Sequence, residues 1–150
     1  MRDLIEATIA AFKAIPNDLI SYLARVGVGA TFFRSGMLKL EGWAEGNTLT
    51  LFREEYRLPL LPPEIAAYLA TTAELTLPLL LFAGLFTRFA SAGLLVMTLV
   101  IEVFVYPNAF DTHGVWAVSL LYLMKYGGGA IAFDSLLGHL WSDNAKGPAT

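Results

Sequence analysis

Apolar residues fall in long runs along this chain, and short polar segments rich in proline separate the runs. Four runs approach or exceed the length that crosses a bilayer as a helix, about 20 residues at about 1.5 Å per residue. They cover about 19–40, 65–86, 89–105 and 115–133. The pattern therefore predicts an all-α membrane protein in which residues 19–138 form a bundle of four transmembrane helices.

The N-terminal segment has the pattern of a short amphipathic helix. Within residues 1–18, Ile5, Ile9 and Phe12 fall on one face of a helix that Asp3 would cap. The helix is too short to cross a bilayer, so we interpret it as lying in the membrane interface. A frayed amphipathic tail is the alternative.

Two further segments are polar. Residues 41–64 form an acidic loop, and Thr48–Tyr56 within it is predicted to be helical. This helix either covers one mouth of the bundle or is an ordinary surface helix. Residues 139–150 form a polar C-terminal tail.

Composition supports a membrane protein. Charged residues make up 15% of the chain and hydrophobic residues 56%, against about 25% charged in average soluble domains. The lipid bilayer is therefore the expected partner. The net charge of −3 and the lack of a basic run argue against nucleic acid as a partner. The chain has no cysteine, which excludes disulfides and thiolate metal sites within it.

Short-loop lysines and arginines predict the orientation. An even number of spans places both termini on one side of the membrane. The basic residues on that side are Arg2, Lys13, Arg88 and Lys146. The opposite loop has Arg53 and Arg57, so both termini are predicted to be cytoplasmic.

Ionisable residues inside the apolar runs are the first candidates for a functional site. One residue from each run falls in the half of the bilayer away from the termini. These residues are Arg34, Glu74, Glu102 and Lys125. Charges isolated in lipid are costly, so we predict that all four face a central cavity. Glu74 is expected to pair with Arg34 or Lys125, and Glu102 is expected to pair with Arg34.

Pro78 makes the position of Glu74 unusual. It follows Glu74 by four residues and has no N–H to donate to the Glu74 carbonyl group. The polar set then has two interpretations. It forms either a pocket for a membrane-soluble ligand or a proton path, or it forms structural salt bridges that fix which helix faces which.

The first run carries two more basic residues. At 100° per residue, Arg25 and Arg34 lie on opposite sides of the helix, while Lys39 returns to within about 40° of the Arg25 side. One helix face therefore cannot carry both arginines. A stripe of small residues suited to close helix packing runs through Gly27, Thr31 and Ser35.

Other candidate chemistry is weaker. His113, in the predicted loop after the third run, is expected to pair with Asp111 or to be solvated. Met37, Met97 and Met124 with His113 would suit a soft metal such as Cu(I), but methionines in apolar spans more often pack. No Ser-His-Asp spacing, HExxH motif or phosphate-binding loop is present, so we predict no catalytic residue and no metal site.

The order and spacing of several motifs resemble those of the DoxX family of membrane proteins. The first run is similar to its R-x-x-x-G…F…G-x-x-K pattern through Arg25, Gly29, Phe33, Gly36 and Lys39. The second is similar to its acidic span through Glu74, followed by a G-L-x-T-R turn that ends at Arg88.

The last run resembles the family's G-P-G-R-x-S-x-D ending through Gly127, Gly129 and Asp134. Three positions depart from that ending. They are Gly128 in place of proline, Ala130 in place of arginine and Ala132 in place of serine. With Pro78, the matching residues form the structural motif that the resemblance implies.

The resemblance implies a four-helix protein of the bacterial inner membrane that serves a membrane redox system, often as a small subunit beside a catalytic partner protein. Quinone-linked thiosulfate oxidation and oxidative-stress complexes are examples. We therefore expect an accessory subunit of an oxidoreductase system rather than an enzyme on its own, with a quinone- or lipid-like ligand and with homo-oligomers as a further option. A transporter component for a small solute or metal-peptide, or a non-catalytic membrane scaffold, are the alternatives.

Overall fold

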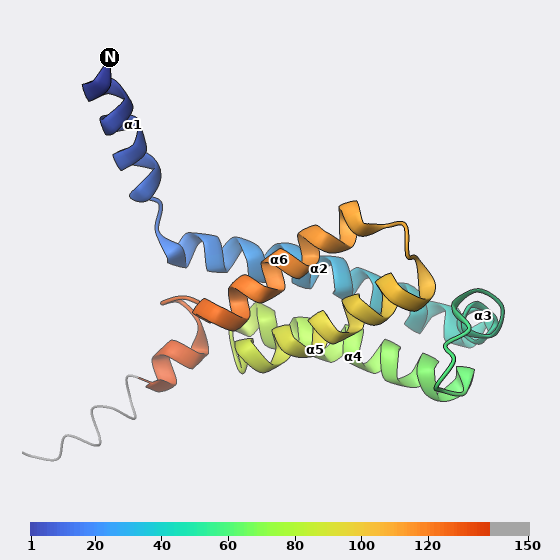
Figure 1. Ribbon diagram of the computed structural model, residues 1–150. Coiled ribbons are helices and arrows are strands. Elements are labelled where there is room, and N and C mark those ends of the chain that lie inside the picture. Colours follow the sequence, from blue (N-terminus) through green and yellow to red (C-terminus); the bar gives the residue numbers. More distant parts are fainter. Residues whose placement is uncertain (139–150) are drawn as a thin grey trace, which may run out of the picture.

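The computed structural model describes residues 1–138, and every regular element in that part of the chain is helical (Figure 1). The elements are α1 (Arg2–Lys13), α2 (Asn17–Ala44), α3 (Asn47–Thr50), the π-helix η1 (Leu51–Tyr56), α4 (Pro63–Ala83), α5 (Thr87–Val100), the π-helix η2 (Ile101–Val105) and α6 (Phe110–Tyr126). Residues 133–138 are also helical. The predicted all-α class is confirmed for the described residues, and the predicted polar tail at 139–150, with Lys146, lies outside them.

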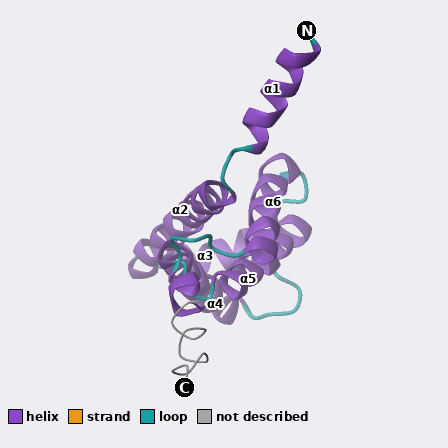
Figure 2. Cartoon of the chain, turned by 90° about the vertical axis from the view of Figure 1, so that its left-hand side faces the viewer, coloured by secondary structure: helices purple, strands orange, loops and turns teal. Residues whose placement is uncertain are grey.

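Four long helices, α2, α4, α5 and α6, form the bundle (Figures 1 and 2). Helix α2 packs mainly on α4, and α5 packs mainly on α6, while contacts of α4 with α5 and of α2 with α6 complete the bundle. Each of the four contributes to one apolar core. The core residues are Val28, Phe32, Leu81, Ala90, Leu94, Leu120 and Leu123.

Helix α6 differs most from its predicted span at 115–133. It begins at Phe110 and ends at Tyr126. The three glycines that follow end it, because Gly127 and Gly129 have φ angles of +80° and +83°, which helical residues do not adopt. Apolar residues beyond the glycines lengthen the hydrophobic run without continuing the helix.

By length and hydropathy, two helical stretches of the described chain are suited to cross a membrane. They are α4 and the stretch Thr87–Val105, which joins α5 to η2. Helix α2 carries several charged side chains, and α6 has only 17 residues, so neither meets the same criteria.

The bundle exposes apolar side chains and buries polar ones. Leu79 of α4, Phe89 of α5 and Val118 of α6 are exposed, as are many other large apolar residues. Buried positions include charged and hydroxyl-bearing side chains, among them Arg25 and Thr98. Water-soluble proteins rarely expose apolar surface on this scale, whereas a lipid environment favours it.

Helix α1 extends away from the bundle, and all of its residues are exposed (Figure 1). Its predicted cap is wrong: Met1 occupies the N-cap position, and Asp3 lies in the first turn. Asp3 at the start and Lys13 at the end both complement the helix dipole.

The predicted helix in the acidic loop is present as α3 and η1. Phe52 of η1 is buried against Ala66 and Ala67 of α4, and Trp43 at the end of α2 packs against this cluster. The segment therefore covers the end of the bundle where α2 ends and α4 begins, as one of the two interpretations of the sequence proposed.

Candidate functional site

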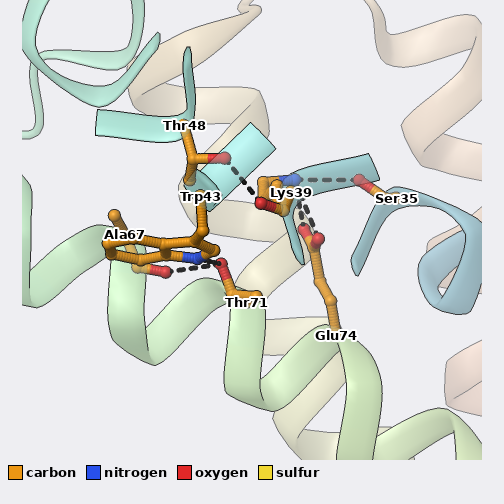
Figure 3. Close-up of polar contacts among 7 residues, drawn as sticks. All are labelled: Ser35, Lys39, Trp43, Thr48, Ala67, Thr71 and Glu74. Atoms are coloured by element: carbon orange, nitrogen blue, oxygen red, sulfur yellow. Dashed lines mark hydrogen bonds and ion pairs between the residues drawn. The ribbon is translucent and has the colours of Figure 1, made fainter. Parts of the chain in front are cut away.

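A buried ion pair joins α2 to α4. The Nζ atom of Lys39 lies 2.8 Å from Oε2 and 3.0 Å from Oε1 of Glu74, and it also donates a hydrogen bond of 2.9 Å to the hydroxyl of Ser35 (Figure 3). The side chains of Lys39 and Glu74 are 7% and 3% exposed. Ser35 and Lys39 are one turn apart on α2, so both meet Glu74 from the same direction.

The two helices come very close at this pair. A Cβ atom on Gly36 would lie 2.9 Å from the carbonyl carbon of Glu74 and 3.0 Å from its carbonyl oxygen. Pro78, which is buried inside α4, has no N–H to donate to that carbonyl. Glycine at position 36 therefore lets α2 pack directly against the turn of α4 that begins at Glu74.

A second layer of hydrogen bonds fixes the C-terminal end of α2 near the pair. Thr48 donates to the carbonyl oxygen of Lys39 over 2.6 Å. The indole N–H of Trp43 donates to Thr71 over 3.2 Å, and the Thr71 hydroxyl donates to the Ala67 carbonyl over 2.8 Å (Figure 3). These bonds connect α3 and α4 to the turn of α2 that carries Lys39.

A cavity of about 420 Å³, which we call the central cavity, lies beside the ion pair. Residues of α2, η1, α4, α5, η2 and α6 line it, and most of them are apolar. Its polar lining consists of Thr31, Ser35, Lys39, Tyr56, Glu74, Tyr106 and His113. The volume and the few polar groups on an apolar wall are typical of small-molecule sites.

Exposed residues of α4 and α5 line one side of the central cavity, and we take this side as its main opening. Leu69 of α4 and Val96 of α5 line it and are both more than half exposed. The opening therefore faces the apolar outer surface of the bundle.

A second polar pair lies on another wall of the central cavity. The Nδ1 atom of His113 is 2.6 Å from Oε2 of Glu102, and the His113 ring lies 5.0 Å from the Trp116 ring. The prediction that Glu102 pairs with Arg34 is therefore wrong. His113 is buried rather than solvated, because α6 begins at Phe110 and carries His113 into its first turn against the bundle.

Two tyrosines complete the end of the central cavity nearest the acidic loop. The hydroxyl of Tyr106 donates to the Glu55 carboxylate, and the rings of Tyr56 and Tyr106 meet edge to face at 5.9 Å. The hydrogen bond to Glu55 and partial burial raise the pKa of Tyr106. Burial raises the pKa of Tyr56. Both phenols are therefore protonated at neutral pH, and the single O–H of Tyr106 is already donated to Glu55.

Arg34 and Lys125 do not join Glu74, so the predicted partners of Glu74 are wrong. Arg34 is exposed on the side of α2 opposite the buried Arg25, as the helical spacing requires. Lys125 is exposed in the last turn of α6, with its Nζ atom 4.9 Å from the ring centroid of Tyr126. Because α6 begins at Phe110, Lys125 lies roughly 22 Å from the start of its helix and not roughly 15 Å.

Lys39 is the actual partner of Glu74, with Ser35 beside it, and the sequence alone does not predict either contact. The helical spacing that places Lys39 on the Arg25 side is a signal for burial, because Arg25 and Lys39 are both buried. The predicted span ended at residue 40, which placed Lys39 at the membrane edge. Helix α2 continues to Ala44, and η1 then packs over it.

The opposite end of the bundle holds the residues of the last motif. The Asp134 carboxylate accepts hydrogen bonds of 2.8 Å from the backbone N–H groups of Phe86 and Thr87, at the start of α5. The Asp18 carboxylate accepts one of 2.8 Å from Ala130 N–H, and Gly129 lies directly against Asp18. The segment after α6 is thus tied to the starts of α5 and α2.

Two arginines bond to helix ends in the same region. Arg25 donates to the Leu81 carbonyl near the end of α4 over 3.2 Å. Arg88 donates to the carbonyls of Met124 and Lys125 at the end of α6 over 3.2 and 3.1 Å. Cations are favourable at helix C-termini, where carbonyl groups lack intrahelical partners.

The described residues hold no group of three or more His, Asp or Glu side chains placed to bind a metal ion. Of the methionines considered for a soft metal, Met97 lines the central cavity together with His113. Met37 and Met124 are not among its lining residues.

Comparisons with known proteins give one family and one relative. A family model described as DoxX matches residues 20–107. An uncharacterized protein of Haemophilus influenzae is 28% identical over 135 residues, which cover 83% of this chain and 87% of the relative. No solved structure matches.

Proposed function

The chain belongs to the DoxX family, and from this we propose that it binds a quinone- or lipid-like ligand in the central cavity, as a small subunit of a membrane redox system. In this proposal the chain is a multi-pass protein of the inner membrane and works beside a catalytic redox partner. Glu74 and Lys39 contact the ligand, and Glu102 acts through His113.

The Lys39–Glu74 pair at the wall of an apolar cavity is the observation that carries this proposal. A buried ion pair is an expensive way to join two helices, since apolar residues of similar size would often serve as well. Its position beside a cavity of about 420 Å³ gives it a second use. The carbonyl oxygen of a ligand would accept a hydrogen bond from the Lys39 ammonium group in place of one of its three present bonds, to Ser35 and to the two Glu74 oxygens.

The shape of the central cavity suits a ligand with a polar ring and a long apolar tail. Lys39, Tyr56, Tyr106 and His113 offer polar groups at its walls, and apolar side chains form the rest. The opening at Leu69 and Val96 would let an apolar tail pass into lipid. A quinone with an isoprenoid tail has this form, and so does a lipid.

In this proposal α2 and α6 cross the membrane together with α4 and the stretch Thr87–Val105, which gives four spans. Helix α2, with 28 residues, is long enough to cross, and its charges at Arg25 and Lys39 are satisfied inside the bundle. Helix α6 spans roughly 25 Å, close to the thickness of the hydrocarbon core. Both termini are then cytoplasmic, and α3 and η1 lie at the outer face.

Tryptophan fluorescence tests the ligand, because Trp116 lines the central cavity and quinones quench tryptophan. Titration of the purified protein in nanodiscs with decylubiquinone should give saturable quenching. Glu74→Gln should weaken this binding by at least about tenfold, or about 1.4 kcal/mol. Glu41→Gln, a change at an exposed position of α2, is the matched control and should bind like the native protein.

The same variants test the role in cells. Glu74→Gln should abolish the associated membrane redox activity while the folded protein stays in the membrane. Unsaturable quenching that is equal in all variants, together with unchanged activity, would contradict the proposal and favour a scaffold in which the pair only fixes helix positions.

A further inference from the structure

A second cavity of about 310 Å³ lies on the other side of Lys39, between α2 and the α3–η1 segment. We call it the side cavity. Leu38 and Gly42 of α2 line it together with Asn47 and Thr48 of α3. Leu38 and Asn47 are exposed, so the side cavity opens to the surroundings at the end of the bundle that α3 covers.

Three residues line both cavities and so form the wall between them. They are Ser35, Lys39 and Tyr56. Two of these are hydrogen-bonded to each other, and Lys39 also holds the Glu74 carboxylate on the side of the central cavity. The Nζ atom of Lys39 lies 6.0 Å from the centre of the Tyr56 ring, so the ring stands beside the ammonium group.

The mouth of the side cavity has an apolar side at Leu38 and a polar side at Asn47, next to the negative charge of Glu45. The Asn47 side-chain amide donates a hydrogen bond of 2.7 Å to the exposed carboxylate of Glu45. A carboxylate beside an entrance attracts cations and concentrates protons near it. The central cavity, by contrast, opens at Leu69 and Val96 onto the apolar surface.

We infer that the side cavity is an aqueous vestibule through which water and protons reach Lys39, while the ligand enters the central cavity from lipid. The inference rests on the proposed function for the use of the protons. A proton passes from the Lys39 ammonium group to an anionic oxygen of the ligand, which leaves a neutral amine. A hydronium ion in the vestibule then returns a proton to the amine and becomes water, so charge and protons balance. The electrons come from the redox partner protein.

The absence of cysteine makes this route testable by single-cysteine labelling. The probe is a cationic methanethiosulfonate, MTSET, which does not cross lipid, added on the α3 face of proteoliposomes. Ser35→Cys in the dividing wall should react within about tenfold of the rate at Asn47→Cys in the entrance. Met97 lines the central cavity but not the side cavity, so Met97→Cys should react at least about a hundredfold more slowly.

A variant that fills the side cavity tests whether MTSET reaches the dividing wall through it. Leu51 lines the side cavity but not the central cavity, so Leu51→Trp should fill the side cavity. Added to Ser35→Cys, it should slow labelling at least about tenfold, and added to Asn47→Cys it should leave the labelling rate unchanged. Tyr56→Cys, in the same dividing wall, gives a second readout in case Ser35→Cys does not fold.

Labelling of both Ser35→Cys and Tyr56→Cys as slow as that of Met97→Cys would overturn the inference. So would labelling that Leu51→Trp leaves unchanged. Decylubiquinone quenching of the same samples tests the ligand separately. Rapid labelling without quenching would overturn the proposed ligand and support the aqueous route.

Discussion

Lys39 and Glu74 lie where a charge is tolerated only with a partner. Their nitrogen and oxygen atoms are 2.8 Å apart, and both side chains are almost completely buried. Removing one member of such a pair leaves the other charged group buried and unpaired, which typically costs about 3–5 kcal/mol. The partners are equivalent in this respect, so loss of either should be more harmful than loss of both.

We therefore predict that Lys39→Met destabilises the protein by about 3–5 kcal/mol, and that the double change Lys39→Met with Glu74→Leu recovers most of this loss. Denaturation in mild detergent with increasing SDS measures the unfolding free energy. The double variant should still fail to bind decylubiquinone. If it is as unstable as Lys39→Met, the ion pair is not the source of the cost.

Tyr106 should show its hydrogen bond to Glu55 in a titration at high pH. The carboxylate of Glu55 raises the pKa of Tyr106 above its usual value of 10.0. The folded state therefore holds this proton more tightly than the unfolded state, so the bond stabilises below pH 10 and is lost as pH rises through the higher folded pKa.

The absorbance of tyrosinate at 295 nm measures this effect. The native protein should retain a tyrosine that ionises late, and Glu55→Gln should bring its pKa back toward 10.0. Tyr106→Phe should remove the late step. Identical titration curves for the native protein and Glu55→Gln would contradict the assignment.

At the scale of helices, the contact between α2 and α4 depends on the absence of one side chain. A Cβ atom on Gly36 would press on the backbone of Glu74, whereas one on Gly27, more than two turns earlier on α2, would meet no atom within 4 Å. The predicted stripe of small residues thus begins, at Gly27, on the side of α2 opposite Gly36, and the contact with α4 is instead made at Gly29 and Gly36.

Gly36→Ala should therefore separate the two helices, cost about 1–3 kcal/mol and weaken ligand binding. Gly27→Ala is the matched control, and its better helix propensity should leave stability unchanged or raise it by up to about 1 kcal/mol. Thermal unfolding in detergent and decylubiquinone quenching measure both effects. Equal stability for the two variants would show that the close contact is not needed.

Helix boundaries explain which parts of the site the sequence could predict. Apolar runs located all four long helices, and helical spacing separated Arg25 and Lys39 from Arg34. The depth of each charged residue along its helix could not be predicted correctly, because depth depends on where the helix begins and ends. α2 extends to Ala44 and α6 begins at Phe110, and these shifts decide that Glu74 meets Lys39 and that His113 meets Glu102.

At the scale of the whole molecule, the two ends of the bundle have different chemistry. The starts of α2 and α5 and the end of α6 are joined by Asp18, Arg88 and Asp134 at one end. At the other end the acidic α3–η1 segment covers the ion pair, and Arg53 binds Glu64 across to α4. An asymmetric molecule of this kind should have one fixed orientation in a membrane.

Four spans with cytoplasmic termini predict the labelling of exposed positions in intact cells. Glu54→Cys, in η1, should react with MTSET from outside the inner membrane, because Glu54 is exposed and the proposed orientation places the α3–η1 segment on that side. Lys13→Cys, at the end of α1, should react only after the membrane is permeabilised. Labelling of both from outside would contradict an even number of spans.

The sideways opening between Leu69 and Val96 changes what an affinity for this protein means. In the proposed function, a ligand that enters through this opening comes from the lipid bilayer, where it is already concentrated and diffuses in two dimensions. Occupancy of the central cavity then follows the mole fraction of ligand in the bilayer rather than its concentration in the buffer. Adding protein-free lipid vesicles would then dilute the ligand and lower the occupancy of the central cavity without any change in the protein.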